Sequence, residues 1–186
     1  MYCAPKKSAE TASTSEIAKV SSHTDTLVSK VDTAWAQMMK DDDARLDAMQ
    51  RITVEIKTLE KYDEAKVAEM QKQIAELKAI RYNQASMADS KSIDNYDAQT
   101  DSVWAREQRL MNAHPRIRQY MLVNQLTDEI NNEIARIIAF RLRYDENADS
   151  LNAYLKQHES TLSQAGEKYS KLKPMPVFRL PEPAKQ

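Results

Sequence analysis

Apolar residues recur every three or four positions through a long stretch of the chain, from Arg116 to Leu172. Residues at this spacing lie on one side of an α-helix. The register lasts for about seven heptads, which favours packing in a bundle or coiled coil. Its positions are Val123, Leu126, Ile130, Ile134, Ile137, Arg141, Tyr144, Ala148, Leu151, Leu155, His158, Leu162, Ala165, Tyr169 and Leu172. The pattern predicts one very long C-terminal helix that begins at Pro115.

A similar pattern runs through the N-terminal third. Ser, Thr and Asp side chains near Thr24 and Asp25 can cap a helix, which predicts a first helix from there. Its apolar positions are Leu27, Val31, Ala34, Trp35, Met38, Leu46, Met49, Ile52, Ile56 and Leu59. The register changes within residues 60–66, where the chain either turns tightly or kinks.

Two shorter helices are predicted between these long patterns. The first carries apolar residues from Val67 to Ile80, and the second spans about residues 97–112. Residues 86–97 are rich in Ser, Asp and Asn, which favour loops, so they are predicted to form the main hairpin connection. The second short helix ends at His114, because Pro115 disfavours helical backbone in the residue before it.

The patterns together predict an all-α fold, an elongated antiparallel bundle of about four long helices. The chain holds one glycine and six prolines, so little interrupts its helices. Three parts are expected: a flexible leader over residues 1–22, the bundle over 23–173, and a proline-rich extended tail over 174–186. We expect Val177, Phe178 and Leu180 in that tail to fold back on the bundle.

Two charged residues, Asp42 and Arg141, interrupt the apolar seams. An unpaired buried charge is costly, whereas a paired one can specify helix register. We expect each to find an opposite charge or to reach solvent, and splayed helices with both residues hydrated are the alternative. Asp42 belongs to the acidic run Asp41–Asp43, which is interpreted as a solvated face because consecutive helical residues point in different directions and cannot wrap a cation.

Charge and composition exclude several classes of partner. The formal net charge is −1 with acidic and basic residues interleaved, so no surface for nucleic acid is expected. No apolar run approaches the roughly 20 residues of a membrane span, and no signal peptide is recognisable. The single cysteine, Cys3, excludes an intramolecular disulfide.

No constellation typical of an enzyme is present. His23, His114 and His158 lack zinc-site spacing, and His158 is interpreted as a seam residue that packs its ring. The only glycine, Gly166, leaves no phosphate-binding loop and no nucleophile elbow. We therefore expect no catalytic residues, no metal site and no cofactor.

The N-terminal residues resemble the start of a mature bacterial lipoprotein. There, a lipid-modified cysteine precedes a Ser/Thr/Ala-rich spacer, as Cys3 does here. Cys3 is accordingly a candidate lipid attachment site, and an inert thiol is the alternative.

Several segments also resemble motifs of the LemA family. Residues 31–35 (VDTAW), followed by Arg45 and Asp47, are similar to its V-x-x-A-W segment and R-R-x-D-L-I-P-N-L motif. Residues 113–115 (AHP) are similar to its A-Y-P break. Further matches to its I-x-x-x-R-x-x-Y-N pattern and following aromatic-Asn pair are Ile137, Arg141, Tyr144, Asp145, Leu151 and Asn152.

The resemblance covers roughly residues 27–158 and has departures. Gln50 and Arg51 replace the family's Pro-Asn, Asp145 replaces Asn, and Leu151 replaces an aromatic residue, so the chain resembles a divergent member. The resemblance implies a long helical bundle held at a bacterial membrane by an N-terminal anchor, with its body outside the bilayer.

Two functions are therefore expected as alternatives. The first is a non-enzymatic, membrane-tethered scaffold or adaptor of the bacterial cell envelope with an unknown protein partner. The second is a soluble coiled-coil module that binds a partner helix in an apolar groove with adaptable methionine contacts. Those methionines are Met38, Met39, Met49 and Met70. The oligomeric state is open in both. A third class, a small-molecule or metal binder, has weak support, because bundle cores can host such sites but the usual Glu and Glu-x-x-His ligands on facing helices are missing.

Overall fold

The computed structural model describes residues 12–114 and 116–178, and every regular element within them is a helix. The all-α bundle predicted from the sequence is confirmed. In chain order the elements are α1 (Thr14–Ile56), α2 (Glu64–Ile80), the 3₁₀ helix η1 (Ser86–Ala88), α3 (Ser90–Asn112), the 3₁₀ helix η2 (Ile117–Gln119), α4 (Met121–Gln157), α5 (Glu159–Gln164) and α6 (Glu167–Ser170).

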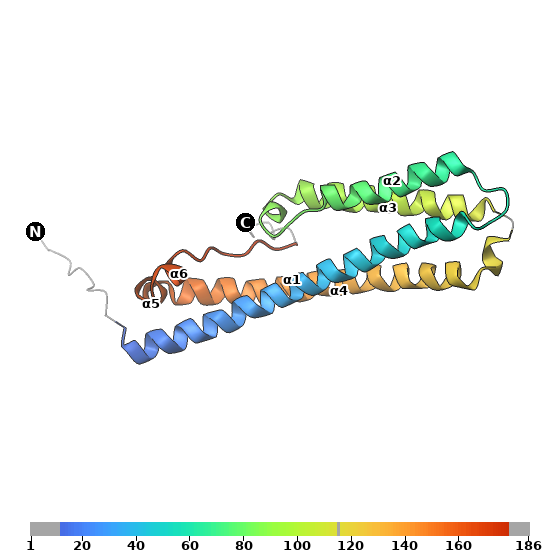
Figure 1. Ribbon diagram of the computed structural model, residues 1–186. Helices are drawn as coiled ribbons and strands as arrows, with labels where there is room; N and C mark the ends of the chain where they lie inside the picture. The colour runs from blue at the N-terminus through green and yellow to red at the C-terminus, as the bar shows by residue number, and fades with distance from the viewer. Residues whose placement is uncertain (1–11, 115, 179–186) are drawn as a thin grey trace, which may run out of the picture.

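The two long helices α1 and α4 pack antiparallel and form the axis of the molecule (Figure 1). Arg51 lies 3.7 Å from Glu129 near one end, and Asn147 donates to the Lys30 carbonyl at 3.3 Å toward the other. The α2–α3 hairpin covers the C-terminal half of α1. The bundle is thus thickest at the end remote from the start of α1, while α5 and α6 pack at the opposite end.

The core follows the apolar seams. Its largest side chains that are almost completely buried include Val31, Met38, Leu46, Met49, Ile52, Leu126, Ile130, Tyr144 and Leu151. Burial of one such aliphatic side chain is worth about 1.5–3 kcal/mol relative to leaving it exposed. The seams therefore supply the main driving force that holds α1 against α4.

The first helix begins earlier than predicted. Ser13 caps α1, its hydroxyl accepting from the Glu16 amide at 3.2 Å, so the predicted start near Thr24 and the boundary at residue 22 are wrong. Val20 and Thr24 extend the seam, being 5% and 0% exposed. The Thr24 hydroxyl is satisfied by the Val20 carbonyl at 2.9 Å, which permits a polar residue at a buried position.

The structure also defines the two connections that flank α2. A turn, not a kink, joins α1 to α2, and within it Lys61 adopts a left-handed φ of 63°. The predicted loop over residues 86–97 is wrong beyond its first residues, because α3 begins at Ser90. Asp89 caps it by accepting from the Lys91 amide at 3.1 Å, and Ile93 and Tyr96 face the core.

The very long C-terminal helix is interrupted. The chain passes through η2 before α4 begins at Met121, and α4 ends at Gln157. His158 forms its C-terminal cap, with its ring 4.2 Å from that of Tyr154, rather than continuing the helix. Gly166 has a φ of 101°, which favours glycine, and it separates α5 from α6. The seam predicted from Arg116 to Leu172 is therefore three helices preceded by a 3₁₀ turn.

After α6 the chain is extended and returns along the bundle toward the α2–α3 hairpin (Figure 1). Met175, Val177 and Phe178 pack against the core. The predicted return of Val177 and Phe178 is confirmed, whereas Leu180 lies outside the described residues.

Candidate functional site: a buried polar and aromatic cluster

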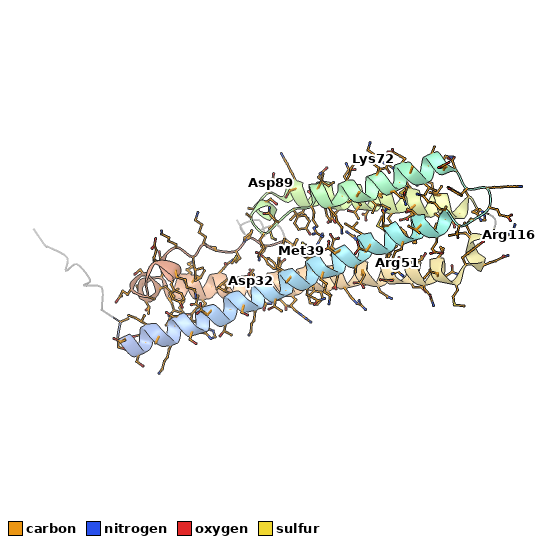
Figure 2. All side chains as sticks on the ribbon, viewed as in Figure 1. Asp32, Met39, Arg51, Lys72, Asp89 and Arg116 are labelled. Carbon is orange, nitrogen blue, oxygen red and sulfur yellow. The ribbon has the colours of Figure 1, made fainter. Side chains whose placement is uncertain are left out.

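The two charged seam residues, Asp42 and Arg141, lie near the middle of the molecule, where the α2–α3 hairpin meets the long helices. Figure 2 marks Met39 on α1, about one helical turn before Asp42, and Asp89 at the nearby end of the hairpin. Polar side chains from four segments converge here.

Asp42 is 2% exposed and has three donors around it. It forms an ion pair with Arg45, one turn along α1. Arg81, directly after α2, donates to it at 2.9 Å, and the Tyr96 hydroxyl of α3 donates at 2.5 Å. Burial and the adjacent Asp42 carboxylate raise the pKa of Tyr96, so its hydroxyl stays protonated and can donate.

Arg141 of α4 is bound by residues of the α2–α3 hairpin. Its two terminal nitrogens donate to the two carboxylate oxygens of Asp97 at 2.6 and 2.7 Å, and one also donates to the Tyr82 hydroxyl at 2.8 Å. Burial lowers the pKa of Arg141, but the hydrogen bonds and charge of Asp97 outweigh it and raise that pKa. This two-pronged geometry is among the strongest that an arginine forms with a carboxylate.

The two groups are in contact. The rings of Tyr82 and Tyr96 meet edge to face, with centroids 5.6 Å apart. We call the combined set the central cluster, and it consists of Asp42, Arg45, Arg81, Tyr82, Tyr96, Asp97 and Arg141. It connects α1, the hairpin and α4, so both predicted seam charges are paired and the splayed, hydrated alternative is wrong.

Phe178 completes the site from the C-terminal segment. Its ring is stacked on Trp35 with centroids 6.4 Å apart, and meets Tyr82 and Tyr144 edge to face at 5.8 and 5.5 Å. The Arg141 guanidinium lies 5.1 Å from its centroid, which is cation–π distance. The returning chain therefore contacts the central cluster directly.

Hydrogen bonds from α4 fix the backbone of this returning segment. The Asn152 side chain pairs with both backbone groups of Met175, donating at 2.8 Å and accepting at 2.7 Å. Asp145 accepts from the Phe178 amide at 2.8 Å. These contacts satisfy backbone groups that no secondary structure would otherwise pair.

The arrangement is suited to fixing geometry. Most of the polar groups named above are directed at each other. Asp42 and Arg45 are buried, whereas the Asp97 side chain is 38% exposed. A buried charge network of this kind can contribute more to a unique arrangement than to net stability, although Arg45 Nε and Arg141 Nε have no hydrogen-bond partner among the described residues. We interpret the central cluster as the joint that sets where the hairpin and the C-terminal segment sit on the α1–α4 pair.

The other predicted sites have different outcomes. Asp41 and Asp42 are 5% and 2% exposed, so the solvated-face interpretation of the acidic run is wrong for both. His114 lies at the end of α3, its Nε2 3.2 Å from the Glu60 carbonyl. Cys3 and Pro115 lie outside the described residues.

The methionines are mostly buried, although Met70 also lines part of a cavity. Met38, Met49 and Met70 are 0%, 0% and 6% exposed and belong to the core, and Met39 is half-buried. Met38 and Met49 are therefore not accessible to a partner helix, and the partner-helix alternative stays a prediction.

The residues of the hairpin and of the C-terminal segment that contact Asp42 and Arg141 were not identified from the sequence. Arg81, Tyr82, Tyr96 and Asp97 fall in or beside the region interpreted as a polar loop, and Phe178 in the proline-rich tail. The available signal was the concentration of Tyr, Arg and Asp at the hairpin end, opposite two seam charges that required partners.

Within residues 12–114 and 116–178, no three His, Cys, Asp or Glu side chains come together as a metal-binding group. Across the same ranges, no helix combines the length and the apolar character needed to cross a bilayer. Comparison of the chain with protein-family models, with curated proteins and with solved structures gave no match.

Proposed function

We propose that this chain is a non-enzymatic, membrane-tethered helical-bundle protein of the bacterial cell envelope that acts as a scaffold or adaptor, and that it is a divergent relative of the LemA family. The LemA-like motifs and the leader with Cys3 motivate the tether and the localisation. The observation that carries the scaffold role is the shape of the bundle together with its closed central cluster.

The shape separates the two ends of the molecule. α1 has 43 residues, which corresponds to a length of about 64 Å. The α2–α3 hairpin lies along the far half of α1, so a tether at the N-terminus would present the hairpin away from its attachment point (Figure 1). A scaffold requires a binding surface that is held rigidly at a distance from its attachment point.

Three residues at positions of the LemA-like motifs have structural roles here, although Asp145 replaces the family's Asn. Arg141 pairs with Asp97, Asp145 holds the Phe178 amide, and Asn152 holds Met175. These contacts give the motif residues a role in assembly of the bundle and require no catalytic role. The proposal therefore treats the motifs as determinants of shape.

The tether is tested by expressing the native gene with its own upstream sequence in cells fed an alkyne fatty acid. We expect the protein to be labelled and to sediment with membranes, and Cys3→Ser to abolish both. Tyr2→Phe is the control, because it leaves the thiol in place. Equal fractionation of the Cys3→Ser protein and the unsubstituted protein would remove the basis for a lipid anchor.

The adaptor role is tested with a photo-crosslinking amino acid that replaces one exposed lysine at a time in cells. Lys72 on α2 is directed away from the bundle (Figure 2), and Lys19 on α1 lies near the tether end and is also exposed. We expect a discrete crosslinked partner at Lys72 and not at Lys19. Crosslinking that is absent or equal at both would contradict presentation by the hairpin.

A further inference from the structure

A cavity lies at the end of the bundle where α1 leads into α2 and α3 ends, remote from the central cluster. It has a volume of about 660 Å³ and lies between the C-terminal end of α1, the first turns of α2 and the last turns of α3. Pockets that bind small molecules commonly fall within about 300–1,000 Å³. The cavity is therefore large enough for a ligand.

Part of the cavity wall is apolar and firmly placed. Ile56 and Met70 contribute to it and are 3% and 6% exposed, so they belong to the core. Tyr62 and Leu110 are half-buried and line it as well. Solvent therefore reaches an apolar wall that is left uncovered by residues 12–114 and 116–178.

Charged side chains around this wall carry a net positive charge. The basic residues that line the cavity are Lys61, Lys66, Arg106 and Arg109, and the acidic ones are Asp63 and Glu69. Four cations against two carboxylates leave a formal charge of +2. The chain as a whole has a formal charge of −1, so the positive balance is local to this cavity.

Two of the cations have no partner in the described part of the chain. Lys66 is paired with Asp63 at 2.8 Å, and Arg106 donates to Gln73 at 3.1 Å. In the described ranges, neither Lys61 nor Arg109 forms an ion pair or a side-chain hydrogen bond. Both therefore remain able to bind an anionic group from outside.

We propose that this cavity binds a small amphiphile with an apolar body and one anionic head group, such as a medium-chain carboxylate. The apolar wall takes the body, and Lys61 and Arg109 take the head group. Charge complementarity selects an anion over a neutral or cationic ligand of the same shape. The proposal does not depend on the tether or on the scaffold role.

A pair of fluorescent probes tests whether the cavity prefers an anionic ligand over a neutral one. 8-Anilinonaphthalene-1-sulfonate has an apolar body with one sulfonate, and N-phenyl-1-naphthylamine has the same body without it. We expect saturable 1:1 binding of the sulfonate and at least about fivefold weaker binding of the neutral probe, the size of effect typical of one charge contact at a partly exposed site. Equal affinities would overturn the anionic selectivity.

Two substitutions test the proposed head-group contacts. Arg109→Gln and Lys61→Asn each remove a cation, and asparagine tolerates the left-handed backbone at residue 61. Each should weaken binding of the sulfonate probe by about two- to fivefold and leave binding of the neutral probe unchanged. The matched control is Lys156→Gln at the other end of α4, which removes an exposed cation outside the cavity. Equal weakening by the control would overturn the assignment.

Filling the cavity tests its location. Ala65 lines it, and the exposed Ala75 lies on the same helix outside it. Ala65→Phe should abolish binding of both probes, whereas Ala75→Phe should not, and circular dichroism would verify that both variants are folded. Decanoate should displace the sulfonate probe from the unsubstituted protein, and decanol should do so more weakly. Probe binding that survives Ala65→Phe unchanged would place the site elsewhere.

Discussion

Arg141 on α4 and Asp97 on α3 form both guanidinium–carboxylate hydrogen bonds, yet the two side chains differ in their contact with water. The side chain of Arg141 is 22% exposed and that of Asp97 is 38% exposed. The carboxylate can be hydrated if it loses its partner, whereas the guanidinium is held between Tyr82 and Phe178. The pair should therefore respond unequally to removal of either member.

We predict that Asp97→Ala destabilises the protein by about 2–3 kcal/mol and that Arg141→Leu costs less, about 1 kcal/mol, because only the first leaves a largely buried charge without its counter-ion. Urea unfolding followed by circular dichroism measures both free energies. Asp101→Ala, on an exposed face of α3 one turn further along, is the control and should change little. The opposite order of the two effects would contradict the structure.

A second prediction concerns Asp42, the most buried acidic residue of the central cluster. Asp42→Ala leaves the buried Arg45 without its carboxylate, whereas Arg81 keeps Asp43 at 2.8 Å. The substitution should cost about 3–5 kcal/mol. Tyr96→Phe removes only one hydrogen bond to a charged group and should cost about 1.5–3 kcal/mol.

The double variant should lose less than the sum of the two single variants, because both act on the same hydrogen bond. The matched control is Asp47→Ala, which removes an exposed carboxylate 3.3 Å from Lys78 and should change the free energy by at most about 1 kcal/mol. An effect of Asp42→Ala as small as that of the control would show that the cluster is not formed.

The all-helical fold and the main seams could be predicted from the sequence because periodicity is a local property. The ends of helices could not be predicted equally well. The spacing from Leu155 to Leu162 stays in register although the helix stops at Gln157, and both leucines are buried. At the start of α1, the first helical turns lie in a polar stretch. The Ser13 cap and the buried Thr24 therefore gave no apolar pattern from which these turns could be predicted.

The candidate site was predictable only in part. Asp42 and Arg141 were identifiable because each interrupts an apolar seam. Their partners come from the hairpin, and the choice among many Asp, Arg and Tyr residues depends on how the hairpin docks on α1 and α4. The return of Phe178 to the bundle was predicted, but its place at the cluster was not, since that place depends on a chain reversal after Gly166 and on two side chains of α4.

The third prediction concerns the returning C-terminal segment. Asn152→Ala removes both hydrogen bonds to Met175, and Phe178→Ala removes the ring packed on Trp35 and Arg141. Each should destabilise the segment by about 1–3 kcal/mol and raise amide hydrogen exchange over residues 172–178 far more than in α1 or α4.

Asn147→Ala is a suitable control, because Asn147 lies on the same helix but bonds to α1 through the Lys30 carbonyl. It should leave exchange in the C-terminal segment unchanged. If Asn152→Ala and Asn147→Ala gave the same exchange profile, the segment would not be held by Asn152.

Glu107 on α3 supplies the last prediction. It is 0% exposed, and neither carboxylate oxygen has a hydrogen-bond partner among the described residues. Burial raises the pKa of Glu107 to about 9, from an ordinary value of 4.5. The side chain is therefore neutral in the folded protein at pH 7, whereas it is ionised in the unfolded chain.

The folded state consequently binds one more proton than the unfolded state between these two values. Stability then falls as the pH rises from about 4.5 to about 9, by at most about 1.4 kcal/mol per pH unit from this group. Glu107→Gln cannot ionise and should be more stable than the unsubstituted protein at pH 8, with the difference shrinking toward pH 5. Urea unfolding at pH 5, 6.5 and 8 measures this difference directly. Glu146→Gln, at an exposed position of α4, should follow the unsubstituted protein at every pH. A Glu107→Gln protein with an unchanged pH dependence would mean that the carboxyl is hydrated or paired in solution.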